Sequence, residues 1–302
     1  MFHKILLMGV RRMAKLSVNW SRVRDTADLN PALIRYTRYL ETKGFKKNTV
    51  ILYTRLINNY LVEVNTDLPT PQDATDYRDS LHDKKLSGSA INNFTAAIIN
   101  YHKMIGEPVK LPFLKLNNSL PYYFDETDIL KIFSVCSNLK HYCMLKVLFF
   151  GCLRSGELCH LDVSDYDPDD LTLRLRETKN ASDAIAFIND ETARELNKYL
   201  LIKPKLEIDG YEPLFITDYC HRWTPTKVLQ MFLKYKEKAG IQKKGGVHCF
   251  SRHSSATLMI TKGCDLRSVQ AILRHRDIHT TLRYTHLCDA VKREKHSQYL
   301  TL

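Results

Sequence analysis

The second half of the chain contains polar residues whose types suit the cleavage of a phosphodiester. They are Arg154, Lys179, His248, Arg252, His275 and Tyr284. Two arginines can grip the nonbridging oxygens of one phosphodiester through their planar guanidinium groups, and such donors stabilise a pentacoordinate state. A tyrosine could attack the phosphorus and form a covalent phosphotyrosyl ester. Lysine and histidine could move protons to the leaving 5′ oxygen and off the tyrosine.

Taken one at a time, these residues also have structural explanations. Arg154 and Glu157, three residues apart, could form a surface pair, and Lys179 could be a solvated lysine on a turn. Tyr284 could pack in a core, since a free phenol keeps its proton up to a pKa of about 10. Only the combination of these residues favours a catalytic role.

Side-chain cations could neutralise the phosphate, and no cysteines have the spacing of a zinc site. We therefore expect neither a metal nor a cofactor.

The elements that must position these residues are mostly helices. Helical periodicity in the second half predicts helices at 126–136, 139–152, 190–202, 224–240, 252–263 and 265–274. Residues 171–177 and 184–188 alternate like strands around the polar turn 178–183, which predicts a β-hairpin among these helices. Lys179 then lies on the hairpin turn, Arg154 at a helix start, and Arg252 at the head of a helix with an apolar face.

The first half predicts a compact bundle of four helices. Asn30 and Thr70 are N-cap residues followed by proline at the first helical position, and Gly44 and Gly106 end the first and fourth helices. We expect a leader at 1–27, a helical domain at 28–106, a proline-containing linker at 107–124 and a catalytic domain at 125–302. The segment 289–302 is helical in pattern.

The composition indicates the kind of binding partner and the cellular compartment to expect. The chain has 45 Lys and Arg against 33 Asp and Glu, a formal charge of +12, which favours a polyanion such as nucleic acid. All eight cysteines lie at or after Cys136 and form no C-x-x-C pair; the spacings Cys136/Cys143 and Cys152/Cys159 predict small core residues. Without a secretory signal or a long apolar run, we expect a cytoplasmic protein with no membrane partner.

The order and flanks of the six residues resemble the tyrosine recombinase family, the phage integrase-type or Xer-like site-specific recombinases. "GCLRSGELCHLDVSD" is similar to the family's first-arginine motif, and "RHSSATLMITKGCDLRSVQAILRHRDIHTTLRYTHL" is similar to its second-arginine and tyrosine segments. The nine-residue step from His275 to Tyr284 matches the family interval. The resemblance implies a mainly α fold, in which an N-terminal four-helix core-binding (SAM-like) domain precedes a mixed α/β catalytic domain with a small β-hairpin sheet.

The resemblance also implies a role for each residue. Arg154 and Arg252 would clamp the phosphate, Lys179 would protonate the leaving oxygen, His275 would support the phosphate or the tyrosine, and Tyr284 would be the nucleophile. Glu157 would orient its neighbours rather than react. The resemblance further implies a nucleoid-associated protein of prokaryotic or viral origin.

Two positions depart from the family pattern. His248 precedes Arg252 by four residues rather than three, although both spacings share one face of a helix. Arg274 stands where a glycine commonly precedes the histidine, so a turn of positive φ there would be strained by roughly 1 kcal/mol; Arg274 and Arg276 would otherwise contact the DNA backbone.

The function that the resemblance implies is site-specific DNA recombination or integration without a metal. The partner would be double-stranded DNA with specific sites, and the protein would be a homo-oligomer that forms a tetramer on DNA. The segment 289–302 would then pack on a neighbouring protomer. A type IB topoisomerase-like enzyme that relaxes DNA, and a catalytically inactive recombinase-like DNA-binding protein, remain alternatives. A metal-dependent nuclease lacks its carboxylate cluster.

Overall fold

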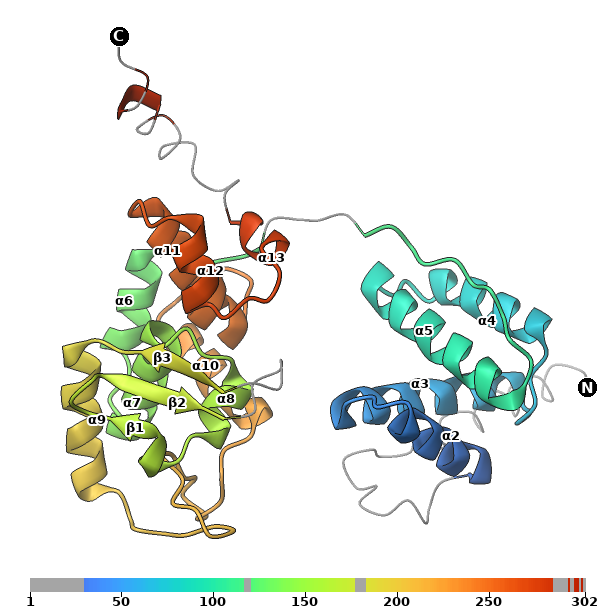
Figure 1. The fold of residues 1–302 in the computed structure, drawn as a ribbon, viewed down its shortest axis with the longest axis horizontal. Helices are drawn as coiled ribbons and strands as arrows, with labels where there is room; N and C mark the ends of the chain where they lie inside the picture. The colour runs from blue at the N-terminus through green and yellow to red at the C-terminus, as the bar shows by residue number, and fades with distance from the viewer. Residues whose placement is uncertain are drawn as a thin grey trace, which may run out of the picture. The chain divides into compact units, whose positions relative to one another are not determined.

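The contacts divide the chain into two compact units, residues 1–118 and 119–302. A computed structural model describes residues 30–116, 121–176, 183–284, 293, 296–298 and 300 (Figure 1). The segment 289–302, expected to meet a neighbour, therefore lies largely outside the described residues, as do the leader and Lys179. The predicted fold class is confirmed, since the described chain is mainly helical with one small antiparallel sheet.

The first unit is built from four helices: α2 (Pro31–Thr42), α3 (Lys47–Val64), α4 (Pro71–Asp83) and α5 (Gly88–Ile105). The expected caps are present, because the side chains of Asn30 and Thr70 accept hydrogen bonds from the first turns of α2 and α4. Gly106 ends α5 at φ +86°, a conformation that suits glycine. Buried tyrosines fill the centre, with Tyr36 edge-on to Tyr101 and its hydroxyl donating to the Ala97 carbonyl.

The segment after α5 packs against the first unit. Val109 and Leu111 are buried in its core, and the Arg78 guanidinium donates to the Pro112 carbonyl through Nε (3.1 Å) and Nη2 (2.8 Å). The apolar and hydrogen-bonded contacts attach this part of the 107–124 segment to the unit that precedes it, whereas Phe124 is buried in the core of the second unit.

The second unit begins with three helices and a short 3-10 turn. These are α6 (Glu126–Ser134), α7 (Leu139–Phe150), α8 (Ser155–His160) and η3 (Val163–Asp165). After the sheet come α9 (Asp190–Ile202), α10 (Pro225–Lys238), the π-helical segment η4 (Cys249–Ser254), α11 (Ser255–Thr261), α12 (Leu266–Ile272) and α13 (His279–Leu282). Helix α7 is apolar on nearly all sides and lies at the centre of this unit.

The predicted hairpin is part of a three-stranded antiparallel sheet of order β1-β2-β3. Its strands are β1 (Tyr166–Asp167), β2 (Thr172–Leu175) and β3 (Ala184–Phe187). Leu173 and Ala186, which are paired in register, are both buried, whereas Phe187 on the other face of β3 is exposed. Sequence reasoning missed β1 because two residues are too few for alternation to show.

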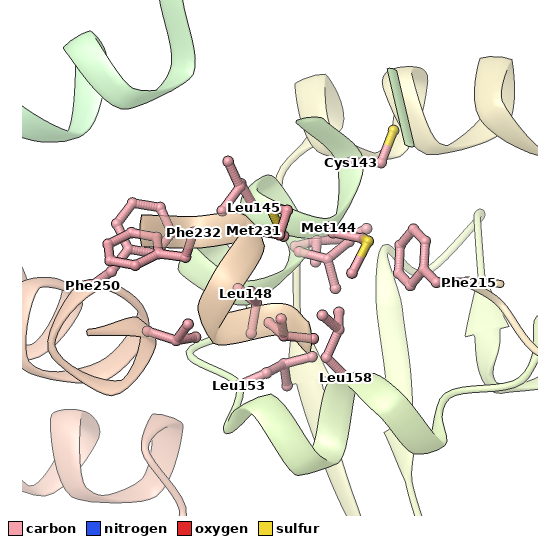
Figure 2. Packing of buried hydrophobic residues seen from close by; sticks show 14 of the residues in the cluster. Cys143, Met144, Leu145, Leu148, Leu153, Leu158, Phe215, Met231, Phe232 and Phe250 are labelled. Atoms are coloured by element: carbon pink, nitrogen blue, oxygen red, sulfur yellow. The ribbon is translucent and has the colours of Figure 1, made fainter. Parts of the chain in front are cut away.

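One apolar core connects the helices that carry the candidate site. Leu148 on α7, Leu153 in the following turn and Leu158 on α8 pack with Phe232 on α10 and Phe250 on η4 (Figure 2). Because a close-packed core resists deformation, the turn before α8 and the start of η4 have fixed positions relative to each other.

The described residues contain no helix long and apolar enough to cross a membrane. Cys136, Cys143, Cys152 and Cys159 are buried, which confirms their prediction as core residues. Cys136 and Cys152 lie just beyond the ends of their helices rather than within them.

Candidate active site

Arg154 begins helix α8 and is held there by Glu157. Its backbone N–H donates to Glu157 Oε2 at 2.8 Å, and its Nη1 donates to Oε1 at 2.6 Å. The Arg154 side chain is 27% exposed, whereas that of Glu157 is only 9% exposed. The surface-pair explanation is therefore wrong, because the carboxylate is buried and fixes both the backbone and the guanidinium of Arg154.

Glu157 also meets a second arginine, Arg274, whose Nη2 lies 3.4 Å from Oε2. Burial raises the pKa of the Glu157 carboxyl, but the backbone hydrogen bond from Arg154 and the charges of Arg274 and Arg154 outweigh it, so that the pKa is lowered. Glu157 is therefore ionised at neutral pH. It orients two guanidinium groups at once.

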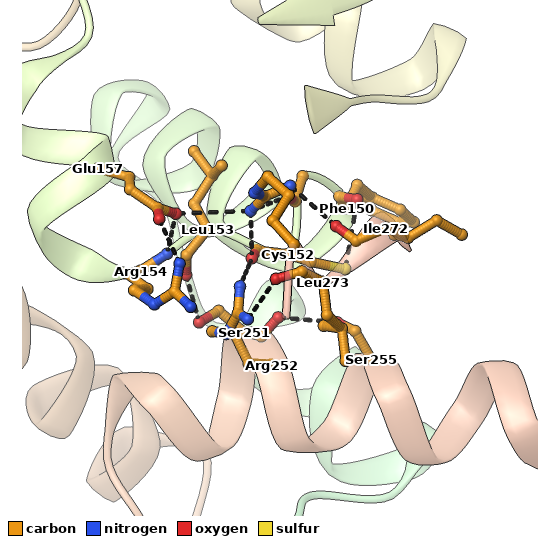
Figure 3. Close-up of polar contacts among 12 residues, drawn as sticks. Phe150, Cys152, Leu153, Arg154, Glu157, Ser251, Arg252, Ser255, Ile272 and Leu273 are labelled. Atoms are coloured by element: carbon orange, nitrogen blue, oxygen red, sulfur yellow. Dashed lines mark hydrogen bonds and ion pairs between the residues drawn. The ribbon is translucent and has the colours of Figure 1, made fainter. Parts of the chain in front are cut away.

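Arg252 is completely buried and lies close to Arg154 and Arg274. Its Nη1 donates to the Cys152 carbonyl at 2.8 Å and its Nη2 to the Leu273 carbonyl, which ties the turn before α8 to the end of α12 (Figure 3). Nε has no hydrogen-bond partner among the described residues. Burial, together with the like charges of Arg154 and Arg274, lowers the pKa of Arg252 to about 10, so the group stays protonated at neutral pH.

His248 and Arg252 lie on one continuous helical stretch. Helical backbone begins at Val247, passes through η4 and continues to Thr261 at the end of α11. A π turn is wider than an α turn, because its hydrogen bonds join residues five apart rather than four. The extra residue between His248 and Arg252 is absorbed by this wider turn, and the His248 ring lies 4.7 Å from that of His253.

Arg274 adopts the left-handed conformation at φ +54°, so the expected turn of positive φ is present despite the side chain. Its guanidinium is only 10% exposed. Nη2 donates to the Cys152 carbonyl at 2.8 Å, Nη1 donates to the Ile272 carbonyl at 2.9 Å, and both lie 3.3 Å from the Gly151 carbonyl. Main-chain carbonyls thus accept from both Nη atoms of Arg274, whereas its Nε has no partner among the described residues. A DNA-backbone contact for Arg274 stays a prediction.

Tyr284 follows α13 and is 2% exposed. Its hydroxyl lies 2.7 Å from Nδ1 of His253, a residue that sequence reasoning missed. Burial raises the pKa of Tyr284, and the charges of Arg252 and Arg283 oppose the rise. His253 directly follows Arg252 in "SRHSS", but nothing in that stretch relates it to a tyrosine 31 residues later.

His275 lies in the same neighbourhood. Its Nδ1 is 2.9 Å from Thr281 Oγ1. Burial lowers its pKa to about 3, with further contributions from the charges of Arg252, Arg154 and the other two histidines. The ring is therefore neutral at physiological pH.

The structure thus brings together Arg154, Arg252, His248, His275 and Tyr284, and adds His253 and Arg274. Lys179 lies outside the described residues. Among the residues that the structure describes, no group of three or more His, Cys, Asp or Glu side chains could hold a metal ion. Guanidinium groups and neutral histidines around a buried phenol suit the binding of a phosphodiester and its attack by oxygen.

Comparisons with known proteins identify similar chains and folds. The family model described as "Phage integrase family" matches residues 123–290. A relative named tyrosine recombinase XerA, from Pyrococcus horikoshii, is 31% identical over 274 residues, covering 87% of this chain and 93% of the relative. The crystal structure of XerA recombinase is 28% identical, covers 90% of this chain and 98% of that one, and superposes with a TM-score of 0.55.

A second solved structure, the Tn1549 transposon integrase in complex with transposon right end DNA, has a TM-score of 0.72 at 19% identity. It covers 89% of this chain and 99% of that one. At this identity the likeness shows the fold alone.

Proposed function

The chain belongs to the phage integrase family of tyrosine recombinases, and from that premise we propose that it cuts and rejoins DNA at specific sites through a covalent 3′-phosphotyrosyl intermediate. Enzymes of this class are DNA strand transferases, and the chain is one of them. The chemical step and the residues that perform it are the proposal.

The observation that carries the proposal is the convergence of Arg154, Arg252 and Tyr284. The charge of Arg252 acts both on Arg154 and on the Tyr284 phenol, although the three residues come from three separate parts of the sequence. Glu157 offsets one of the three guanidinium charges of Arg154, Arg252 and Arg274, and the positive charge that remains in this buried place is unfavourable unless a further anion binds. A phosphodiester is an anion of the right geometry for two guanidinium groups.

We assign the roles as follows. Arg154, the partly exposed arginine, meets the phosphate first, and Arg252 supplies the second clamp. Tyr284 attacks the phosphorus and Lys179 protonates the leaving 5′ oxygen. Because Arg252 and Tyr284 are buried, the substrate must open a path to the phenol as it binds.

His275, whose pKa is lowered by burial, donates or accepts hydrogen bonds around the phosphate. His248, whose ring lies beside that of His253, does the same. The guanidinium groups supply the charge that a metal ion would otherwise supply.

The proposed partner is double-stranded DNA. The formal charge of +12 favours a polyanion, and two solved relatives of the same fold are named as complexes with DNA: the Tn1549 integrase with transposon right end DNA, and a lambda integrase dimer bound to a COC′ core site. We propose that four protomers assemble on two recombination sites.

The test uses duplexes with a nick and randomised sequence around it, because the target site is unknown. A nick lets the freed end diffuse away, so a covalent adduct accumulates. Adducts that survive denaturation with detergent are collected and their DNA is sequenced. We expect the wild-type chain to select a DNA sequence and to give an adduct, and Tyr284→Phe to give none.

Other outcomes would contradict the proposal in recognisable ways. An adduct with Tyr284→Phe would move the nucleophile elsewhere, with Tyr299 the next phenol to substitute. Relaxation of a supercoiled plasmid that lacks the selected sequence would favour a topoisomerase. Binding of DNA without any adduct would identify a scaffold that no longer cuts.

A further inference from the structure

The Tyr284 hydroxyl has its hydrogen-bond partner on the helix that carries Arg252. Nδ1 of His253 lies 2.7 Å from it, and the ring centroids are 5.6 Å apart. We propose that His253 accepts the phenol proton of Tyr284 when that oxygen attacks the phosphorus. This inference rests on the proposed function and assigns one proton transfer within it.

The position of His253 is fixed by hydrogen bonds from its neighbours on the helix. Ser251 Oγ donates to the Leu153 carbonyl at 2.7 Å, and Ser255 Oγ donates to the Phe149 carbonyl at 2.9 Å. Ser254 Oγ accepts from the Phe124 N–H at 2.8 Å. Three serines thus anchor the backbone on both sides of His253 (Figure 3 shows Ser251 and Ser255), so the ring is held at hydrogen-bond distance from the phenol rather than reaching it by chance.

The resting protonation states are those that a transfer from oxygen to nitrogen requires, but the low pKa of His253 and the raised pKa of Tyr284 oppose the transfer until an anion is bound. Burial, with the charges of His248, Arg283 and Arg252, lowers the pKa of His253 to about 4, so the ring is neutral and offers a lone pair. The pKa of Tyr284 is raised by burial, so the phenol keeps its proton and is the donor. The proton on the imidazole then lies on Nε2, the tautomer in which Nδ1 accepts.

A bound phosphate makes this transfer easier. Without DNA, the positive charges of Arg252 and Arg283 disfavour a protonated His253. A phosphodiester beside Arg252 supplies negative charge that offsets them, and an opposite charge nearby raises the pKa of a histidine. His253 therefore becomes a better base only when the substrate is in place, which limits idle ionisation of the tyrosine.

The step balances as follows. The Tyr284 O–H bond breaks and its proton passes to His253 Nδ1, while the phenol oxygen forms a bond to phosphorus. The bond from phosphorus to the 5′ oxygen breaks, and that oxygen leaves with the electron pair and is protonated by the general acid. In the rejoining step the 5′ hydroxyl attacks the phosphorus and gives its proton back to the deprotonated general acid. The bond from phosphorus to Tyr284 breaks, and His253 returns the proton to the phenol oxygen.

The other two histidines are less well placed for this role. Nδ1 of His275 is engaged with Thr281 Oγ1, and the ring of His248 stands edge-on to that of His253, with an interplanar angle of 89°. We assign to His248 the support of the His253 ring, in addition to its contact with the phosphate.

The experiment measures single-turnover adduct formation on the selected nicked duplex by the full chain and by His253→Asn. Asparagine places an oxygen near the position of Nδ1, so it keeps a hydrogen bond to the phenol but is not a base. We expect the rate to fall about 100-fold or more, the usual contribution of a general base, with DNA binding unchanged. His221→Asn, an exposed histidine of the same unit, is the matched control and should keep the wild-type rate.

A second substrate distinguishes deprotonation of the tyrosine from protonation of the leaving group. In a duplex with sulfur in place of the bridging 5′ oxygen, the leaving thiolate needs no protonation, since thiols have a pKa near 8.5. His253→Asn should stay slow on this duplex. His253→Ala should be slow on both duplexes and should regain rate when imidazole is added.

The results that would overturn the inference are distinct. Rescue of His253→Asn by the sulfur duplex would place His253 on the leaving-group side. If His253→Asn reacts within twofold of the wild-type rate, the contact between His253 and Tyr284 is only a packing contact. If it reacts faster than wild type, the hydrogen bond to His253 restrains Tyr284 and lowers its reactivity. Failure of the wild-type chain to form any adduct would refute the proposed function instead.

Discussion

Arg274→Gly tests whether a strained arginine has become part of the framework of the site. Glycine removes the cost of the left-handed conformation at φ +54°, about 1 to 2 kcal/mol. It also removes the guanidinium that donates to the carbonyls of Cys152 and Ile272 and lies beside Glu157. The two effects have opposite signs, so the measurement decides which is larger.

The contacts indicate that the loss is larger. A hydrogen bond from a charged group contributes about 1.5 to 3 kcal/mol, and two such bonds, at 2.8 and 2.9 Å, would disappear. The Cys152 carbonyl keeps its bond from Arg252, and repulsion between the two guanidinium groups is relieved, which reduces the loss. With the relief of strain included, we expect a net destabilisation of about 2 kcal/mol.

The assay is urea unfolding followed by tryptophan fluorescence. The chain contains two tryptophans, so a Trp20→Phe background leaves the emission of Trp223, which belongs to the second unit. Cys220→Gly is the matched control, because Cys220 is exposed and has φ +58°. It should gain up to about 1 kcal/mol from relief of strain alone.

The reasoning fails if Arg274→Gly unfolds at the same or a higher urea concentration than the wild type while Cys220→Gly behaves as expected. In that case the guanidinium contacts would contribute less than the strain. Arg274→Lys, which keeps both the strain and the charge, should be less stable than Arg274→Gly if the fork geometry rather than the charge is what matters.

Two further predictions concern pH and the segment between the units. The pKa of His275 is lowered from 6.5 to about 3, so as the pH falls the unfolded chain takes up a proton at this histidine before the folded chain does. The free energy of unfolding is therefore unaffected by His275 above about pH 6.5. It decreases as the pH falls toward 4, by up to about 1.4 kcal/mol per pH unit. His275→Asn should flatten the pH dependence of the urea midpoint, and an unchanged slope would contradict the lowered pKa. Arg78→Ala removes both bonds to the Pro112 carbonyl, so trypsin should cleave after Lys110 or Lys115 about tenfold faster. Asp79→Ala, which removes only an exposed partner of Arg78, is its control, and equal cleavage of the two variants would show that apolar packing alone holds the segment.

The sequence by itself predicted most of the elements and named the candidate reacting groups. Caps and helical periodicity placed α2 to α5 correctly, because Asn30, Thr70 and the prolines after them act within a few residues of chain. The strands of the hairpin were visible as alternation. The resemblance of the segments around Arg154, Arg252 and Tyr284 pointed to the family, since those motifs are local in sequence.

Only the tertiary structure decided how these groups meet. The contact of His253 with Tyr284 spans 31 residues, and that of Arg252 with Cys152 spans 100, so no periodicity could predict either. The π turn that absorbs the extra residue before Arg252 depends on packing against the helices around it. Arg274 shows the same limit: the sequence predicted strain at that position, but the carbonyls that make the strain tolerable come from a turn more than 100 residues earlier. Local patterns fix local backbone, whereas charges and protons respond to whatever the fold places beside them.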